Sequence, residues 1–331
     1  MAILVTGGMG AIGSFVTRRL VEIGEIPVVY SRHKDTVLLS DIEDKMKIVE
    51  GDLLDFDKLL QTVKTYGIDR IIHASAMLSE AGSNPAMAIR VNVEGTARVM
   101  DAALQCNVKR VVYMSTKGVY NEANGEYGHP TYKPVSEDYP ADGNMGWYGL
   151  TKLFGERVAF QYFQQRGLDV IALRFSATWG PGKLLKHGAT SPMSVHGRMI
   201  EHAMLGKPFR HPQGAEQKDD LIYSRDTANG IVLACFAENP THRLFNIGSG
   251  QASTLTDLAD AVRKIYPGAD IQIGPGLDSF NIGCNVYSVY DISRAKKELG
   301  FSPQYNLEDA VQDYVETLRG LNIEPVYTPG S

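Results

Sequence analysis

The sequence predicts an α/β fold built on a doubly wound parallel sheet, and three observations predict it. A glycine-rich turn follows the first apolar strand, short apolar strands then alternate with amphipathic helices, and Tyr148 and Lys152 stand four positions apart on a later helix. Strands that alternate with helices form a parallel sheet, because each crossover returns the chain to the same edge. This is the Rossmann-type arrangement, and we expect a smaller, interspersed C-terminal substrate-binding domain beside it.

Composition bounds the class of protein. The 331 residues are 44% hydrophobic and 21% charged, which is typical of a globular chain, and the net charge of -5 argues against nucleic acid or an anionic membrane as a partner. Cys106, Cys235 and Cys284 are few and scattered, as expected of reduced thiols. There is no basic leader and no apolar run of the roughly 20 residues that span a bilayer. We therefore expect a cytoplasmic protein that acts on a small molecule.

The first element is an apolar strand at residues 2–5 that runs straight into a glycine-rich turn. Gly7, Gly10 and Gly13 are spaced so that the chain turns tightly, the backbone approaches a pyrophosphate and the next helix packs close to the sheet. The helix N-terminus that follows offers free N–H groups to phosphates. A motif of this kind between a first strand and a helix predicts a dinucleotide site.

The alternation continues through the first half of the chain. We expect strands at 26–30, 70–73 and 110–114, a third strand before Gly51, and helices at 55–66 and 86–106. Ligands of such sheets bind beyond the carboxyl ends of the strands. The predicted cofactor-binding residues accordingly follow strands or open helices: Gly7, Gly10, Ala11, Ile12, Gly13, Ser31, Arg32, Asp52, Leu53, Ala74, Ser75, Ala76, Tyr148 and Lys152.

The end of the second strand indicates which dinucleotide is bound. A carboxylate there would hold the ribose 2′-hydroxyl of NAD, whereas Ser31 and Arg32 offer a hydroxyl and a guanidinium to a 2′-phosphate. This favours NADP over NAD. The alternative is a solvated basic turn on an enzyme that uses NAD.

Tyr148 and Lys152 are the predicted centre of the chemistry. The same spacing occurs at Tyr30 and Tyr113, but those residues lie in expected strands, where residues four apart are separated by roughly 13 Å. On a helix the two side chains are neighbours. An ammonium within a few Å favours phenolate, so we expect Lys152 to lower the tyrosine pKa from about 10 by roughly 1–3. Tyr148 would then serve as a general acid/base.

The later part of the chain alternates between sheet and lid. We expect helices at 194–205, 226–236, 254–265, 291–299 and 306–318, with Thr254 and Asp257 as a capping box, Asp291 and Asn306 as N-caps and Gly300 after a C-terminus. The expected division is residues 1–174 for the dinucleotide domain, with 219–248 returning to it. Residues 175–218 and 249–331 would form the substrate-binding region and its lid.

Motifs along nearly the whole chain resemble the extended short-chain dehydrogenases/reductases, the NAD-dependent epimerase/dehydratase family. They are the glycine turn, Gly51-Asp52, Asn92 within Val-Asn-Val-Glu-Gly-Thr, Ser115-Thr116, the Tyr148/Lys152 pair, Arg174-Phe175 and Trp179-Gly180-Pro181. The resemblance implies an NAD(P) cofactor, a role for Lys152 on the nicotinamide ribose, Thr116 bonded to the substrate oxygen and Asn92 near the site. It also implies a homodimer formed through helices 86–106 and 148–166. For Thr116 and Asn92 the alternative is ordinary hydrogen bonding to backbone.

Two positions depart from the pattern of nucleotide-sugar epimerases. Ala177 stands where that pattern has an Asn, and Asp219 stands where it has an Arg that neutralises the pyrophosphate. Exchanging a guanidinium for a carboxylate turns attraction into repulsion, which disfavours a nucleotide-sugar substrate. Lys117-Gly118 replaces the acidic pair that dehydration needs. The segment 73–79 bears a partial likeness to short-chain threonine dehydrogenases.

Four residues are candidates for contact with substrate: Ser79, Lys117, Thr178 and Thr190. Lys117 could meet a substrate carboxylate or point to solvent. His196 and His202 fall in the helix at 194–205, where packing at the surface or helix edge is the expectation. The eight histidines form no metal-ligand pattern, so no metal site is expected.

Three functions remain open. The first is an oxidoreductase that transfers hydride between NAD(P) and a small polar hydroxy or keto compound, with Tyr148 as general acid/base. The second is a sugar or nucleotide-sugar epimerase that oxidises its substrate transiently and retains NAD(P). The third is a non-catalytic dinucleotide sensor, which the presence of both Tyr148 and Lys152 disfavours.

Overall fold

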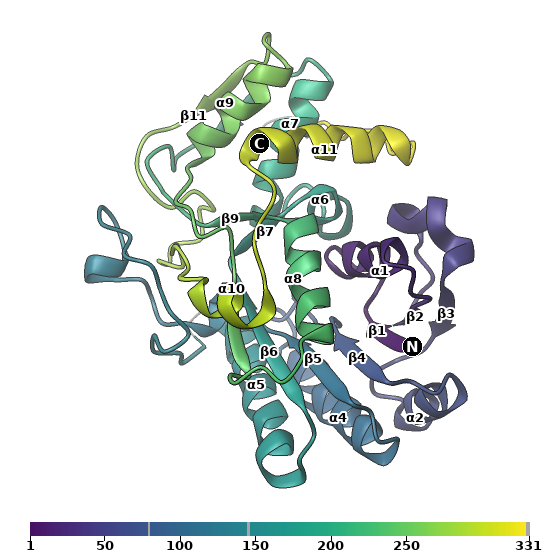
Figure 1. Ribbon diagram of the computed structural model, residues 1–331. Coiled ribbons are helices and arrows are strands. Elements are labelled where there is room, and N and C mark those ends of the chain that lie inside the picture. The colour runs from purple at the N-terminus through teal and green to yellow at the C-terminus, as the bar shows by residue number, and fades with distance from the viewer. Residues whose placement is uncertain (79, 144–145, 329–331) are drawn as a thin grey trace.

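A seven-stranded parallel sheet forms the centre of the structure. The computed structural model describes residues 1–78, 80–143 and 146–328 (Figure 1). Strand order is β10-β6-β5-β4-β1-β2-β3, so the chain winds outward in both directions from β1. The strands are β1 (Ile3–Thr6), β2 (Val28–Ser31), β3 (Lys47–Glu50), β4 (Arg70–His73), β5 (Arg110–Met114), β6 (Val170–Phe175) and β10 (Leu244–Ile247). The predicted doubly wound fold is confirmed.

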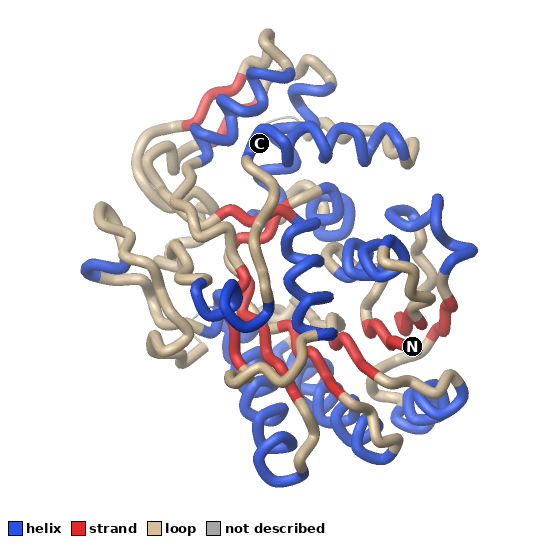
Figure 2. The backbone as a smooth tube through the Cα atoms, in the orientation of Figure 1, coloured by secondary structure: helices blue, strands red, loops and turns tan. Residues whose placement is uncertain are grey.

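Helices cover both faces of this sheet. On one face lie α1 (Gly13–Glu22) and α8 (Ser224–Phe236), which pack on each other, with α10 (Ser293–Leu299) at the β10 end. On the other face lie α2 (Phe56–Thr65), α4 (Gly95–Gln105) and α5 (Gly146–Arg166). Figure 2 shows the red strands between these two layers of blue helices. Apolar side chains from both sheet faces form two separate core clusters, because the parallel sheet is buried on both sides.

The expected helix at 86–106 is three pieces. Pro85–Ile89 forms α3, Arg90–Glu94 is a π-helical turn, and only then does α4 begin. Wider turns of this kind occur inside helices at functional sites. Here the turn carries Asn92, whose side chain contacts α5.

The remaining elements gather at the carboxyl end of the sheet and above it. They are η1 (Val37–Lys45), η3 (Lys117–Val119), η4 (Gly125–Tyr127), β7 (Ala177–Trp179), α6 (Pro181–His187), η5 (Pro192–Ser194), α7 (Val195–Met204), β8 (Phe209–His211), β9 (Leu221–Tyr223), α9 (Leu255–Ile265), β11 (Ile271–Ile273) and α11 (Leu307–Gly320). β7 pairs with β9 and β8 with β11, both in parallel. A separate apolar cluster joins α7, α9 and α11, which form the upper lobe in Figure 1.

Local signals at helix ends are mostly confirmed. Thr254 and Asp257 form the capping box, Asn306 caps α11 by accepting from the Asp309 N–H at 2.9 Å, and Gly300 ends α10 with φ of 66°. Asp291 lies one residue farther out than predicted. The N-cap of α10 is Ile292, and the Asp291 carboxylate accepts from the Ser293 N–H.

The helix that carries Tyr148 exposes a large apolar residue. Ala159 is buried, but Phe154 is 56% exposed on α5. Helix α3 packs on α5, and its residue Ile89 is 45% exposed. No helix in the described part of the chain is both long and apolar enough to cross a bilayer.

Candidate active site

A cavity of about 90 Å³ lies beside Tyr148, at the carboxyl ends of β5 and β6. This is the edge where open parallel sheets bind their ligands. Its lining comes from the glycine turn, β5, α5, β6–β7, α6 and α7: Ile12, Leu78, Ser115, Thr116, Lys117, Tyr148, Phe175, Ser176, Ala177, Thr178, Lys183, Met193, His196, Phe280 and Val286. The cavity therefore brings the predicted Tyr148, Thr116, Lys117 and Thr178 together.

Thr116 and Tyr148 line the cavity together, and an interaction between their side chains affects the Tyr148 pKa. Thr116 directly follows Ser115 at the end of β5, and its hydroxyl also accepts from the Gly118 N–H at 3.2 Å, which caps η3. Both expectations for Thr116, backbone bonding and contact with the reacting group, are thus compatible with its position. Burial raises the pKa of Tyr148 to about 12, although the interaction with Thr116 lowers it.

Lys152 is almost fully buried one turn after Tyr148. Its ammonium lies 4.1 Å from the centre of the Tyr113 ring, and burial lowers the Lys152 pKa to about 7 against the opposing effect of Glu156. The expected lowering of the tyrosine pKa is therefore wrong for this structure. Desolvation disfavours both charged forms, and Lys152 is not among the groups that shift the Tyr148 pKa, so near neutral pH Tyr148 keeps its proton.

A buried ion pair fixes the helix on which both residues stand. Arg174 of β6 donates to both carboxylate oxygens of Glu156, at 3.0 and 2.8 Å. Both side chains are under 5% exposed. Two parallel hydrogen bonds define orientation as well as distance, so α5 is held in register against β6.

Asn92 holds other residues in place and does not line the cavity. Its amide donates to the Met77 carbonyl at 3.0 Å and to the Thr151 hydroxyl at 2.9 Å, and its oxygen accepts from the Met77 N–H at 2.7 Å. The backbone alternative is the one seen here. Asn92 ties the segment after β4 to the turn of α5 that precedes Lys152.

The glycine turn forms the cradle that a dinucleotide requires. A Cβ on Gly7 would lie 2.9 Å from the Ser75 backbone, and one on Gly13 would lie 2.1 Å from the Gly7 carbonyl oxygen. Gly7 also has φ of 69°. Side chains are thus excluded where a pyrophosphate has to approach. The buried Ser31 hydroxyl, at the end of β2, has no partner among the described residues. These residues fit a nicotinamide dinucleotide.

The other predicted cofactor residues occupy the same edge of the sheet. Asp52, after β3, is exposed, and its carboxylate accepts from the Leu54 N–H at 2.8 Å while Leu53 is buried. Ala74, Ser75 and Ala76 follow β4, and the Ser75 N–H lies 3.4 Å from the Thr6 hydroxyl. Arg32 is exposed after β2.

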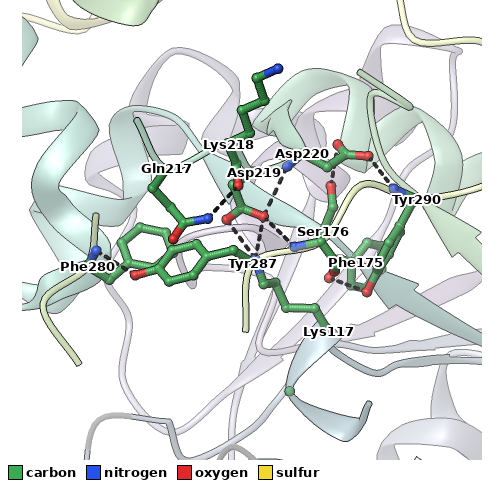
Figure 3. Close-up of polar contacts among 12 residues, drawn as sticks. Lys117, Phe175, Ser176, Gln217, Lys218, Asp219, Asp220, Phe280, Tyr287 and Tyr290 are labelled. Atoms are coloured by element: carbon green, nitrogen blue, oxygen red, sulfur yellow. Dashed lines mark hydrogen bonds and ion pairs between the residues drawn. The ribbon is translucent and has the colours of Figure 1, made fainter. Parts of the chain in front are cut away.

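Lys117 is committed to an internal partner. Its ammonium bonds both oxygens of Asp219 at 2.7 Å, and Figure 3 shows it rising toward that carboxylate beside the Tyr287 ring. Asp219 also accepts from the backbone N–H groups of Asp220, at 3.0 Å, and Ser288, at 3.3 Å. Lys117 is 9% exposed and does not point to solvent. Its attraction lowers the Asp219 pKa, although burial has the larger, opposite effect.

The other candidate substrate residues do not all lie in the same cavity. The Thr178 hydroxyl lines the cavity and lies 3.2 Å from that of Thr227. Thr190 lines a neighbouring hollow of about 580 Å³ with Arg198 and His211, because the chain has left the cavity after the end of α6. Ser79 lies outside the described residues.

Sequence reasoning missed four polar cavity residues: Ser115, Ser176, Lys183 and His196. Lys183 lies two residues after the Trp179-Gly180-Pro181 motif, and its closeness to that motif could have marked it as a candidate site residue. His196 was expected at the surface or helix edge, but it is 3% exposed, and neither ring nitrogen has a partner among the described residues. The Ser115 hydroxyl is likewise buried and unpaired within the described chain. Residues 1–78, 80–143 and 146–328 hold no cluster of three metal-ligating side chains.

The chain is similar in sequence to a known protein family and to known relatives. The model of the NAD-dependent epimerase/dehydratase family matches residues 3–248. A putative UDP-glucose 4-epimerase of Methanocaldococcus jannaschii is 27% identical over 326 residues, covering 97% of this chain and 99% of that protein. A UDP-glucose 4-epimerase of Halalkalibacterium halodurans is 28% identical, with 94% of each chain covered.

Solved structures agree in fold. A UDP-glucose 4-epimerase of Thermotoga maritima with UDP-glucose superposes with a TM-score of 0.80 at 24% identity, covering 97% of this chain and 99% of that one. MoeE5 in complex with UDP-glucuronic acid and NAD gives a TM-score of 0.78 at 25% identity, with the same coverage. The similarity extends over almost the whole length in each case.

Proposed function

Because the chain belongs to the NAD-dependent epimerase/dehydratase family, we propose that it inverts a hydroxyl-bearing carbon of a sugar or nucleotide sugar by transient oxidation with retained NAD(P). The observation that carries the proposal is that Thr116 and Tyr148 line one cavity at the carboxyl end of a sheet whose glycine turn fits a dinucleotide. The relatives that match along nearly their full length, described as UDP-glucose 4-epimerases, favour epimerisation over net oxidation.

Tyr148 is the general acid/base in this scheme. Its phenolate takes the proton of the substrate hydroxyl as the carbon loses hydride, and its phenol returns a proton when hydride comes back to the other face. The bound dinucleotide supplies the hydride acceptor and donor. With its pKa near 12, Tyr148 is a phenol at neutral pH, so it has to lose its own proton before it can take one from the substrate hydroxyl, whereas it is ready to return a proton to the substrate oxygen.

The neighbouring residues position the substrate and Tyr148. As the family resemblance implies, Thr116 would bond the reacting oxygen of the substrate and Lys152 would hold the nicotinamide ribose. Asn92 positions the turn of α5 that precedes Lys152, through its hydrogen bond to Thr151. The cofactor set predicted from sequence lines the path from the glycine turn to Ser31 and Arg32. An unpaired buried hydroxyl beside an exposed guanidinium supports a 2′-phosphate, hence NADP in preference to NAD.

A second candidate is a net dehydrogenase or carbonyl reductase for a small polar hydroxy or keto compound. Ala177 and Asp219 favour it, because they replace the Asn and Arg expected to hold a nucleotide diphosphate. The cavity volume of about 90 Å³ also favours it. Ligand pockets usually measure about 300–1,000 Å³, so the cavity in this structure is smaller than a nucleotide sugar requires.

One experiment separates the two. The purified protein is incubated with UDP-glucose, UDP-galactose, their free sugars or small hydroxy compounds, in parallel without and with added NADP or NAD, and the products are resolved by NMR while absorbance near about 340 nm is followed. Interconversion without a change in absorbance supports epimerisation. Stoichiometric formation of reduced cofactor, dependent on added NADP or NAD, supports the dehydrogenase, and neither signal with any substrate contradicts an enzymatic role.

Assembly and domain division complete the proposal. Ile89 of α3 and Phe154 of α5 expose large apolar side chains on adjacent helices, which supports a homodimer through this face. The separate apolar cluster of the upper lobe supports the proposed division at residue 174, and α8 and β10, which pack on and join the main sheet, support the return of 219–248 to the first domain. The pairing of β9 with β7 goes against that return for residues 221–223, since both strands share the upper-lobe cluster.

A further inference from the structure

Lys183 is a cation in the cavity without a counter-ion. It lies on α6, lines the same cavity as Thr116 and Tyr148, and forms no hydrogen bond or ion pair with any described residue. Burial alone lowers its pKa, to about 8, and no acidic group opposes that effect. A desolvated ammonium is costly unless something pairs with it.

The position of α6 explains why Lys183 faces the chemistry. A Cβ on Gly182 would lie 2.4 Å from the Ala11 carbonyl oxygen, so the first turn of α6 packs directly on the glycine turn. Figure 1 shows α6 between α1 and the helices of the upper lobe. Lys183 is thus held between the dinucleotide cradle and Tyr148.

His196 supplies a second, independent observation at the same place. It lies on α7, which packs on α6, and it is 3% exposed with both ring nitrogens unpartnered in the described chain. Burial lowers its pKa to about 3, with Lys183 and Lys117 among the charges that add to the effect. The ring is therefore neutral and offers one N–H donor. A buried unpaired polar group in a cavity calls for a ligand to satisfy it.

The other cation in the cavity cannot serve the same purpose. Lys117 already binds both carboxylate oxygens of Asp219 at 2.7 Å, so that pair has no net charge to offer. Lys183 is left as the uncompensated charge among the cavity residues that the structure describes. The lining favours a substrate that brings one negative group with it.

We propose that Lys183 and His196 form a subsite for an oxyanion, a carboxylate or a phosphate, carried by the part of the substrate that reacts at Tyr148. The inference rests on the proposed function in that it takes the Tyr148 cavity to be the substrate site. It adds the substrate class: a hydroxy compound whose reacting portion is itself anionic. Lys183 supplies the charge and His196 the directed N–H donor.

The test compares pairs of compounds that differ by one anionic group, with NADP present at saturation. The pairs are UDP-glucuronic acid with UDP-glucose, glucuronate with glucose, glycerate with glycerol, and glycerol 3-phosphate with glycerol. Binding is measured by calorimetry and thermal shift, so turnover is not required. The wild-type protein is expected to bind at least one anionic member about tenfold more tightly than its neutral twin, and which pair responds distinguishes carboxylate from phosphate.

Variants assign that preference to the subsite. Lys183→Met is expected to abolish the preference, Lys183→Arg to retain most of it, and His196→Phe to weaken it. Lys186→Met is the matched control, since Lys186 lies on the same helix but pairs with Asp35 outside the cavity. Circular dichroism checks folding, which losing an unpaired cation does not threaten.

The outcomes separate this inference from the proposed function. A preference that survives in Lys183→Met, an absence of preference in the wild-type protein, or a loss of NADP affinity in Lys183→Met that accounts for the effect would each overturn the subsite. Tyr148→Phe is expected to keep the preference while losing turnover. Should Tyr148→Phe remain fully active, the proposed function fails even where the binding preference stands.

Discussion

Removing the carboxylate of Asp219 is expected to destabilise the fold severely. Asp219→Asn leaves the Lys117 ammonium, in a side chain 8% exposed, without its partner at 2.7 Å. Breaking a buried pair from one side costs about 3–5 kcal/mol, because the remaining charge stays desolvated. Both backbone N–H groups bond the Oδ1 atom of Asp219, so the asparagine oxygen can still accept from both and most of the loss is due to the charge.

The assay is chemical denaturation at pH 7, followed by circular dichroism. Asp270→Asn is the matched control, since Asp270 pairs with Arg210 at 2.6 Å but the side chains are 55% and 45% exposed. Exposed pairs contribute about 0–1 kcal/mol. The double variant Lys117→Met/Asp219→Asn removes both charges and is expected to recover more than half of the stability lost in Asp219→Asn.

Two results would refute this reasoning. If Asp219→Asn costs no more than Asp270→Asn, the pair is not desolvated in solution. If the double variant is no more stable than Asp219→Asn, the damage comes from lost hydrogen bonds to the backbone and not from an orphaned ammonium.

The remaining predictions concern catalysis, acid stability, assembly and cofactor choice. Tyr148→Phe is expected to reduce turnover by about 10²–10⁴ with unchanged circular dichroism; near-wild-type turnover would exclude Tyr148 as the acid/base. The pKa values of His73 and His196 fall from 6.5 to about 3 on folding, so stability is full above pH 6.5 and declines as the pH falls toward 3, by up to about 1.4 kcal/mol per pH unit for each. Denaturation midpoints at pH 7, 6 and 5 check this, and a flat profile would contradict it. Phe154→Glu is expected to convert the proposed homodimer to a monomer, as measured by the molar mass from light scattering. A wild-type protein that is already monomeric would contradict the proposed dimer. Arg32→Glu is expected to lower the binding affinity for NADP relative to NAD by about tenfold or more in calorimetry, since a charge-assisted hydrogen bond contributes about 1.5–3 kcal/mol; an unchanged ratio of affinities would place the 2′-phosphate elsewhere.

The sheet, the glycine cradle and the helix caps could be predicted because their causes are local in sequence. Gly7 and Gly13 are needed for a turn of a few residues, and Thr254 meets Asp257 three positions later. The Tyr148/Lys152 spacing likewise specified one face of one helix. Each pattern carries its own geometry, so no knowledge of distant segments was needed.

The pKa at Tyr148 could not be predicted in the same way. Spacing gives the distance between a phenol and an ammonium but not the burial of either group. Lys152 lies on the Tyr113 ring of β5, a strand 39 residues away. Its desolvation lowers its own pKa to about 7, so the charge meant to acidify Tyr148 is itself weakened.

The interpretation of Asp219 changes most between sequence and structure. As a single position it appears as a carboxylate facing two phosphates, which argues for repulsion. Its partner Lys117 is 102 residues away and was itself interpreted separately, as a substrate contact or a solvated side chain. Together they form a neutral pair behind the cavity wall that Lys117 lines, so the departure from the Arg pattern removes an attraction without adding a repulsion. Under the subsite proposed above, recognition of a negative substrate would then fall to Lys183.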